Sequence, residues 1–327
     1  MTKAPARERQ FARAGAGACQ PAAADAVTHR RPSGATHGKG GRAAGKPDAA
    51  KVIHASPAAP LCAKGGPGLG ETSQLPTFEV EDRSFTRLIL GHNPFLGGSY
   101  MSRARSREYE ERFRTFEPIR DVILAALELG VRSMMVSIDH PRNDLIGQAI
   151  AAAQEQTGLE MSNIVIIHPG FRDHLDFMRQ VNCQLCLVHG QNTDSFFRRS
   201  ERTFPAEFVE LLAAVRAEGF VPGMSTHNAG ETIPTARDFD VAVVNTPVNK
   251  IAWRMCPCVE EVLGALRDWP RKVIAMKPLA MGRIAPDEGM QYIATVPGVD
   301  GVVVGIATPW EAEETFGAAT RAWALPC

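Results

Sequence analysis

Several short apolar runs in this sequence end in a residue that can move a proton or bind a ligand. Asp139, His168, His189 and Lys277 stand at four of these run ends, and we predict that they form a catalytic set. Imidazole and carboxylate groups exchange protons near neutral pH, and a buried lysine suits a base or Schiff-base chemistry. A second group stands at comparable positions and is predicted to contact the substrate: His92, Asn93 and His140.

The elements that must position these residues can be counted along the chain. The apolar runs are typical of strands covered on both faces, and there are eight: residues 87–92, 131–139, 163–168, 183–189, 220–226, 240–245, 272–277 and 301–306. Amphipathic patterns follow them at residues 116–130, 144–158, 172–181, 206–219, 229–238, 259–269, 287–296 and 310–323. Eight such units predict a (β/α)8 TIM barrel, an α/β fold whose chemistry lies where the strands end. A doubly wound open sheet is the alternative, but no GxGxxG turn follows any run.

Alternation along the predicted strands indicates which side chains can meet. Residues two apart share a face of a strand, so Lys277 shares the face of Ala275 and His189 that of Leu187. If these faces point into the barrel, the four residues of the catalytic set converge at its mouth. An alternative is a divalent metal site that keeps one open position. Its predicted ligands are His168, His189 and His227.

The first 75 residues differ from the rest in composition. They are rich in Ala, Gly and Pro, carry eleven Lys and Arg against four Asp and Glu, and show no periodicity. We therefore predict a disordered leader over residues 1–75 and the barrel domain over residues 76–327. Three interpretations of the leader stay open: a flexible tail, a targeting segment, or sequence upstream of a misassigned start.

Charge and hydropathy argue against two classes of partner. The chain is neutral overall and its first 75 residues are basic, so residues 76–327 are mildly acidic and show no clustered Lys and Arg. We therefore expect no nucleic-acid partner. No apolar run reaches the length of a membrane span, so we expect no membrane partner either. The expected partner is a small-molecule substrate in the cytoplasm; the oligomeric state has no signal in the sequence.

Cysteine pairs at residues 183 and 186 and at residues 256 and 258 have the spacing of metal ligands. Strand alternation, however, predicts that Cys183 and Cys186 point to opposite faces of their strand. Two side chains that point apart cannot share a metal ion. We interpret these cysteines as buried packing residues and loop thiols.

Over residues 86–320 the chain resembles the aldo-keto reductase superfamily, chiefly its divergent bacterial members. The stretch "DVILAALELGVRSMMVSID" is similar to the family's segment that ends in its catalytic Asp, which falls on Asp139, and "LVHG" is similar to the strand that bears its catalytic His, which falls on His189. "PGMSTHNAGETI" resembles the segment that meets the nicotinamide amide, with Ser225 as the matching Ser. "VIAMKPLAMGRI" and "VPGVDGVVVGIATPWEAEETF" resemble the last two barrel units. The residues then predicted to contact an NAD(P)H cofactor are Ser225, Asn228, Asn245 and Gly305.

Two departures from the family's pattern bear on the reaction. The family places a catalytic Tyr a few residues after the Asp, and this sequence has "DHPRND" there. The family's catalytic Lys ends the third strand, where this chain has His168. The eighth unit also shows no Arg for the 2′-phosphate of NADP, because "GIATPWEAEE" is acidic.

The sequence thus supports two hypotheses for the reaction. One is an aldo-keto reductase-like enzyme that acts on a small carbonyl or sugar-like substrate, with Asp139, His168 and His189 in acid-base roles and NAD(P)H as hydride donor. The alternative is a non-redox lyase, isomerase or hydrolase, metal-dependent or cofactor-free, that uses Asp139, His168, His189 and His227. A barrel that only binds a partner through its loops is a third hypothesis. Residues 95–118 form a long charged loop that we expect to cover the barrel mouth.

Overall fold

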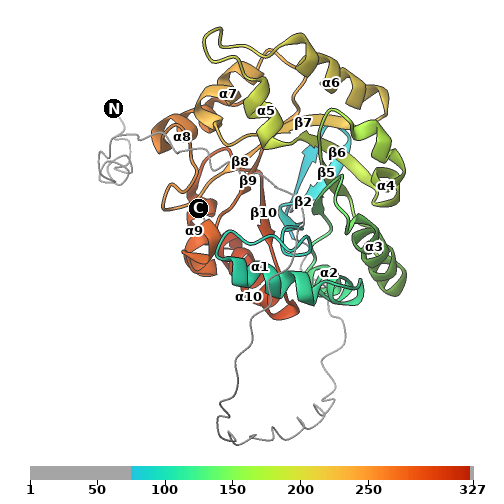
Figure 1. Ribbon diagram of the computed structural model, residues 1–327. Coiled ribbons are helices and arrows are strands. Elements are labelled where there is room, and N and C mark those ends of the chain that lie inside the picture. Colours follow the sequence, from blue (N-terminus) through green and yellow to red (C-terminus); the bar gives the residue numbers. More distant parts are fainter. Residues whose placement is uncertain (1–74, 325–327) are drawn as a thin grey trace, which may run out of the picture. The chain divides into compact units, whose positions relative to one another are not determined.

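Eight parallel strands close into a barrel (Figure 1), which confirms the predicted fold class. The structure is a computed structural model that describes residues 75–324. Strands consecutive along the chain are neighbours all the way round, and the last pairs with the first to close the ring. The barrel strands are β3 (Leu88–Gly91), β4 (Met134–Ser137), β5 (Asn163–Ile167), β6 (Cys183–Val188), β7 (Val221–Ser225), β8 (Val243–Pro247), β9 (Lys272–Met276) and β10 (Gly301–Gly305).

Helices surround these strands on the outside (Figure 1). The eight that the sequence predicts are α2 (Glu117–Glu128), α3 (Asn143–Thr157), α4 (Leu175–Gln180), α6 (Ala206–Ala217), α7 (Ala229–Ala236), α8 (Val259–Asp268), α9 (Pro286–Thr295) and α10 (Pro309–Ala324). Short 3₁₀ turns, η1 (Phe171–His174) and η2 (Ala280–Gly282), lie before α4 and α9. Two helices were not predicted: α1 (Arg103–Arg112) and α5 (Gly190–Phe196). Helix α1 lies within residues 95–118, for which the sequence predicts a covering loop.

The helix α2 shows how the sequence fixes these elements locally. Ile119, Val122, Ile123 and Ala126 are buried at the spacing of one helical face. Gly130 follows the helix with a φ of 86°, a left-handed conformation that glycine adopts without steric cost. The helix therefore ends there, and the next strand can begin.

Apolar side chains fill the inside of the barrel, so it is a packed core and not a channel. They come from alternate positions of the strands and form a cluster of their own, which includes Ile89, Ile164, Leu185 and Ile274. The remaining strand positions pack against the helices in a second, larger cluster. Because the interior is filled, a ligand can reach the strands only at their ends.

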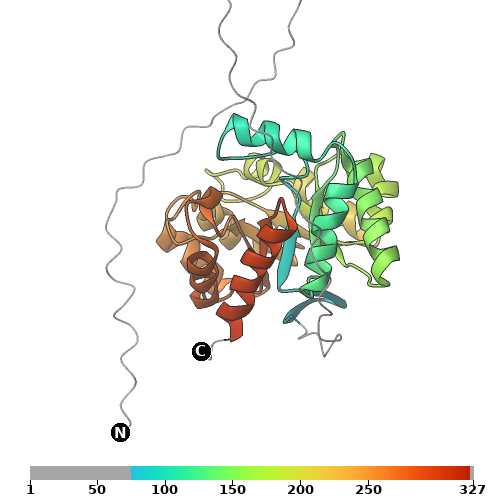
Figure 2. The ribbon, with the colours of Figure 1, turned by 90° about the horizontal axis from the view of Figure 1, so that it is seen from below.

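A two-stranded hairpin covers one end of the barrel interior. It consists of β1 (Thr77–Val80) and β2 (Arg83–Thr86), which pair antiparallel and were not predicted. Phe78 and Phe85 stack with ring centroids 5.7 Å apart and join the interior cluster. Figure 2 shows this hairpin (blue) and α1 (blue-green) at opposite ends of the molecule. The open end of the barrel is therefore the one that holds the carboxyl ends of the strands.

Strand β6 corrects the prediction for its two cysteines. The Sγ atoms of Cys183 and Cys186 lie 3.6 Å apart, and both residues pack in the outer cluster. The cause is a register shift: Asn163 pairs with Cys183, but the next residue of β5 pairs with Leu185. The extra residue in β6 breaks the alternation. The prediction that these side chains point to opposite faces is therefore wrong.

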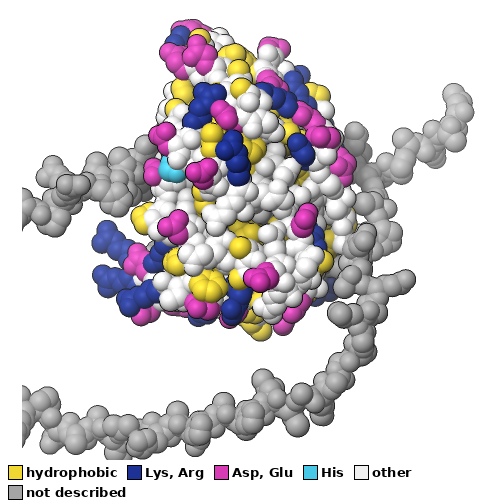
Figure 3. All heavy atoms as spheres, turned by 90° about the vertical axis from the view of Figure 1, so that its right-hand side faces the viewer, with side chains coloured by type: hydrophobic (Ala, Val, Ile, Leu, Met, Phe, Trp, Pro, Cys, Tyr) yellow, Lys and Arg dark blue, Asp and Glu magenta, His cyan; other side chains and the backbone are white. Residues whose placement is uncertain are grey.

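The leader predicted for residues 1–75 lies outside the described residues, apart from Leu75, which is buried in the barrel domain. Its disorder and the domain boundary stay predictions. Within residues 75–324, no helix is both long and apolar enough to span a membrane. On the face drawn in Figure 3, side chains of Lys and Arg are mixed with those of Asp and Glu over most of the surface, and several basic side chains gather at its lower left.

Replacing Gly223→Ala should destabilise the barrel by about 1–3 kcal/mol, as over-packing does. A Cβ atom there would lie 2.6 Å from the side chain of Leu187 and 2.7 Å from the carbonyl oxygen of Val243, and that backbone atom cannot move aside. Urea unfolding measures the change. The matched control is Gly264→Ala in α8, where a Cβ meets nothing within 4 Å.

The control should stabilise the protein by up to about 1 kcal/mol, because alanine favours a helix over glycine. Equal effects of the two substitutions on the free energy of unfolding would contradict this packing of β7.

Candidate functional site

A cavity of about 640 Å³ opens at the carboxyl ends of the barrel strands. We call it the mouth pocket. Its base includes Ser137, Ser225 and Asn245, which continue the inward rows of their strands. Other residues that line it and bear on the chemistry are His92, Asn93, Tyr100, Arg105, His189, His227, Trp253, Lys277, Gly305, Trp310 and Glu311. The pocket has the size and the position expected of an active site in a barrel.

Three strand-end histidines turn one ring nitrogen back onto their own loops. The Nδ1 atoms of His140, His168 and His189 accept hydrogen bonds from the backbone N–H groups two residues on, at 3.2, 3.2 and 3.3 Å. In the neutral rings Nε2 therefore carries the proton. For His189, which lines the mouth pocket, burial lowers the pKa and favours this neutral form. Its Nε2–H can donate to an oxygen atom of a bound molecule.

His92 is held by two hydrogen bonds at the end of β3. Nδ1 lies 2.6 Å from the carbonyl oxygen of Met135 and must donate to it, and Nε2 lies 2.9 Å from the hydroxyl of Ser137. Burial lowers the pKa of His92 to about 4. The ring is therefore neutral at physiological pH with both nitrogens bonded, and its role is to join β3 to β4. The neighbouring Asn93 is exposed, and its carbonyl oxygen accepts from Gly98.

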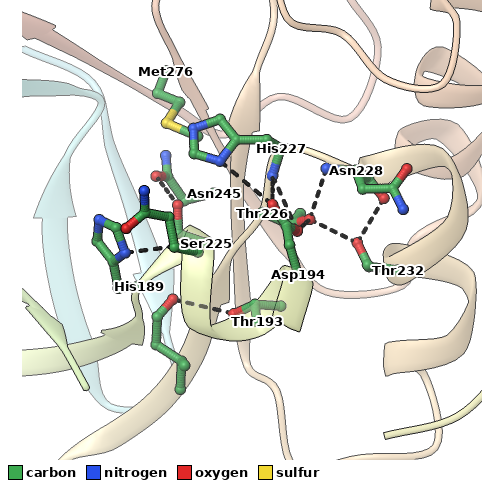
Figure 4. A network of polar contacts seen from close by, with 12 residues as sticks. His189, Thr193, Asp194, Ser225, Thr226, His227, Asn228, Thr232, Asn245 and Met276 are labelled. Carbon is green, nitrogen blue, oxygen red and sulfur yellow. Dashed lines mark hydrogen bonds and ion pairs between the residues drawn. The ribbon is translucent and has the colours of Figure 1, made fainter. Parts of the chain in front are cut away.

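A carboxylate that the sequence analysis did not identify holds the loop after β7 (Figure 4). Asp194, on α5, accepts from the hydroxyl of Thr226 at 2.6 Å and from the backbone N–H of His227 at 3.1 Å. It also lies 3.5 Å from Nδ1 of His227. The ring of His227 rests against Gly190, where a Cβ would approach it to 2.9 Å. The carboxylate therefore fixes the place of His227 in the pocket wall.

The residues predicted to contact a cofactor divide between the pocket and its surroundings. The hydroxyl of Ser225 donates to the side-chain oxygen of Asn245 at 3.1 Å, and the amide nitrogen of Asn245 donates to the carbonyl of Ile274 at 3.0 Å. Gly305 also lines the pocket. Asn228 does not: its amide donates to Glu231 at the start of α7 (Figure 4 shows Asn228 directed away from Ser225).

Lys277 reaches the mouth pocket by a route that alternation did not predict. Ala275, two residues earlier, packs in the outer cluster, so a regular strand would turn Lys277 outward as well. The backbone of Lys277 instead has a φ of 60°, and this left-handed residue brings the side chain to the mouth. Such a conformation costs about 1–3 kcal/mol for a non-glycine residue and is typical of functional sites. Burial lowers the pKa of the amine.

Aromatic rings form the rim of the pocket next to this amine. Tyr100, from the loop after β3, meets Trp253, from the loop after β8, with ring centroids 5.8 Å apart. The Nζ atom of Lys277 lies 5.1 Å from the centroid of the Tyr100 ring. The guanidinium of Arg254 lies 5.7 Å from that centroid on an exposed stretch of chain. The rim thus combines apolar surface with positive charge.

The predicted catalytic set does not come together as a whole. His189 and Lys277 line the mouth pocket, whereas Asp139 and His168 are not among its lining residues. Asp139 has a φ of 61° and a side chain that is 71% exposed, and its carboxylate lies 3.7 Å from Nε2 of His168. This pair lies beside the pocket, and His140 is bonded into the same loop.

The predicted metal site is not assembled. In residues 75–324, no group of three or more His, Cys, Asp or Glu side chains is placed to hold a metal ion. His168 pairs with Asp139 outside the pocket, and the ring of His227 is occupied by Asp194. The ligand set of His168, His189 and His227 is therefore wrong for this structure.

Loops supply two pocket residues that sequence reasoning missed, Tyr100 and Trp253, and helix α5 supplies Asp194, which holds His227 in the pocket wall. Periodicity marks strands and helices but carries no signal for a residue between them. The strand-end rule finds residues that directly follow a strand, and Tyr100 lies nine residues after Gly91. A search for aromatic residues in the long loop after β3 would have found it.

No protein-family model matches this chain, and no curated protein sequence matches it. Solved structures do. A putative aldo-keto reductase from Pseudomonas aeruginosa is 16% identical, with 78% of this chain and 99% of that chain covered and a TM-score of 0.57. The holo form of an aldo-keto reductase from Bacillus halodurans is 12% identical, with 78% and 93% covered and a TM-score of 0.55. An aldo-keto reductase from Bombyx mori, in complex with NADP, is 13% identical, with 76% and 92% covered and a TM-score of 0.52. The chain therefore shares the fold of aldo-keto reductases.

Lowering the pH from 6.5 toward 4 should destabilise the protein through His92. Its pKa is lower in the folded chain than its ordinary value of 6.5, so the unfolded chain binds more protons in this window. The contribution of the neutral His92 ring to the free energy of unfolding is complete above pH 6.5 and is lost as the pH falls. It amounts to about 3 kcal/mol. Denaturant unfolding at several pH values measures it, with His92→Gln as the variant that cannot titrate.

The difference in unfolding free energy between the native protein and His92→Gln should shrink as the pH falls, because other buried histidines titrate in both proteins. A His92 ring that titrates near pH 6.5 by NMR would contradict the assignment.

Proposed function

We propose that this chain is an enzyme that acts on a small aldehyde or ketone held in the mouth pocket. One observation carries the proposal: the side chain of Lys277 is partly buried in the pocket wall, and among the described residues no carboxylate forms an ion pair with its amine. An amine in such a place can donate a hydrogen bond to a carbonyl oxygen or attack a carbonyl carbon. A structural lysine would instead be paired or exposed.

Other groups of the pocket suit the same substrate. The Nε2–H of neutral His189 can donate to the carbonyl oxygen. Apolar and aromatic walls would surround the rest of the molecule, and they include Leu96, Trp253, Met276, Leu279 and Trp310. We therefore propose a substrate with an apolar or aromatic substituent. Asp139 and His168 have no part in this proposal, because they do not line the pocket.

Reduction of the carbonyl is the reaction that the likeness to aldo-keto reductases favours, and the Bombyx mori structure contains NADP. At the base of the mouth pocket, both amide groups of Asn245 are already bonded within the chain, and Asn228 is bonded to Glu231. The hydroxyl of Ser225 donates to Asn245 and could meet a nicotinamide amide only as an acceptor. Of the four residues predicted to contact the cofactor, two are therefore committed elsewhere.

The diphosphate of a dinucleotide fits less well. At the start of α10, the carboxylate of Glu311 accepts from the backbone N–H of Ala307 at 2.7 Å and so takes a group that could bind a phosphate. Glu314 also lines the pocket. Arg105, a cation that lines the same pocket, is bonded to Glu108 and lies 3.6 Å from Glu311. The residues present do not fit a dinucleotide, and no step of this proposal runs through one.

The test is saturable binding of aromatic aldehydes and ketones, measured by calorimetry on the full chain. We expect Lys277→Met to weaken binding by at least about tenfold, because it removes the group that meets the carbonyl. The matched control is Lys272→Met at the other end of β9, whose amine is paired with Asp300 at 3.0 Å. That variant should bind as the native chain does.

Absence of binding by any carbonyl compound, or equal affinities of the two variants, would contradict the proposal. The same titration with NADPH decides between the reactions. The acidic start of α10 predicts no saturable binding of NADPH; tight binding would favour reduction.

A further inference from the structure

Three lysines occur in residues 75–324, and their surroundings differ. The amine of Lys250 lies 2.7 Å from Glu288, and that of Lys272 lies 3.0 Å from Asp300. The amine of Lys277 contacts the sulfur of Met276 at 3.5 Å and the hydroxyl of Tyr100, and it forms no ion pair with the described residues. Two lysines are thus paired with carboxylates, and the third, which lines the mouth pocket, is not.

The surroundings of Lys277 favour its neutral form. Burial acts first and lowers the pKa of the amine, and the nearby guanidinium of Arg254 lowers it further. Interaction with Tyr100 acts in the opposite direction but does not reverse the shift. A lowered pKa increases the share of the amine that carries the free lone pair a nucleophile needs.

The position of the amine suits attack on a molecule in the pocket. The left-handed backbone at Lys277 places the side chain at the mouth, between the Tyr100 ring and the base of the pocket. His189 lines the same pocket, and the charge of Lys277 contributes to lowering its pKa. A carbonyl group bound beside both residues would have a hydrogen-bond donor for its oxygen and an amine to attack its carbon.

We propose that Lys277 forms a Schiff base with the aldehyde or ketone that the mouth pocket binds. This inference rests on the proposed function and deepens it, because it assigns a covalent, cofactor-free reaction to the same site. The class of ligand is an aldehyde or unhindered ketone with an apolar or aromatic substituent.

The step balances without an oxidant or a reductant. The lone pair of Nζ attacks the carbonyl carbon, a C–N bond forms, and the electrons of the C=O π bond move to oxygen. Nitrogen then releases a proton and regains its lone pair, and oxygen takes a proton. The resulting carbinolamine loses its hydroxyl group as water with a second proton. The lone pair of nitrogen then forms the C=N bond of a protonated imine. In total, a carbonyl compound and a lysine ammonium give an iminium and water.

Tyr100 is placed to move these protons. Its hydroxyl interacts with the Lys277 amine, and its ring is half exposed at the rim, so it contacts both the reacting nitrogen and solvent. We expect Tyr100→Phe to slow imine formation without preventing binding, since the ring that borders the pocket remains.

The experiment is reductive trapping. The full chain is incubated with phenylacetone, a ketone that reacts poorly with surface lysines, and with sodium cyanoborohydride, which reduces imines to stable amines. Mass spectrometry should then find one adduct per chain, heavier by the mass of the ketone less one oxygen atom. Peptide mapping should place it on Lys277 and not on Lys250 or Lys272.

The matched control is Lys277→Arg, which keeps a cation but cannot form an imine. It should remain folded, as thermal unfolding will show, and should give no adduct on the mapped peptide. Tyr100→Phe should be trapped at least about tenfold more slowly than the native chain.

Two negative results are distinguishable. Phenylacetone that binds saturably but leaves no adduct, or adducts spread evenly over the lysines, would overturn the Schiff base and leave the proposed function standing. Absence of both binding and adduct, for phenylacetone and for the other aromatic carbonyl compounds, would overturn both. An adduct of equal yield in Lys277→Arg would also overturn the inference, because the nitrogen would belong to another residue.

Discussion

The candidate site depends on the parallel closure of eight strands around a filled interior. Parallel strands bring all their carboxyl ends to one face, and closure of β10 on β3 sets these ends in a ring. The interior cluster and the β1–β2 hairpin leave no other way in. Residues far apart in the sequence, such as His92 and Lys277, therefore line one pocket. The polar side chains of the candidate site therefore lie at the carboxyl ends of the strands, where the packed interior stops.

The polar groups at this end differ in how well the chain satisfies them. His92 has both ring nitrogens bonded, the histidines after β4, β5 and β6 each turn one nitrogen to the backbone, and Asp194 accepts from the Thr226 hydroxyl and the His227 N–H. These contacts stabilise the loops. Lys277 differs: it is a partly buried amine without a carboxylate partner in the described chain, on a left-handed residue. Such groups cost several kcal/mol of stability, and proteins keep them where function requires them.

The sequence predicts the barrel well because each strand is an apolar run and several helices end at a glycine, as α2 does at Gly130. It predicts the hairpin poorly, because its strands have four residues each and follow a segment with no pattern. The site is predicted in part. His189 follows its strand and lies in the pocket, and so does Lys277. Alternation wrongly places Asp139 in the pocket and does not predict the route by which Lys277 reaches it, because both residues have positive φ values that periodicity cannot reveal. Tyr100 becomes a pocket residue only through the path of the loop after β3, and Asp194 acts on the pocket only through its contact with His227.

The measurement that tests this account most directly is the titration of the lysine side chains by NMR, with carbon-13 at the ε position. The account predicts that the pKa of Lys277 lies below the ordinary lysine value of 10.5. A Lys277 signal that titrates at the ordinary value would contradict it, because the amine would then be a solvated cation and not the reactive group of the pocket.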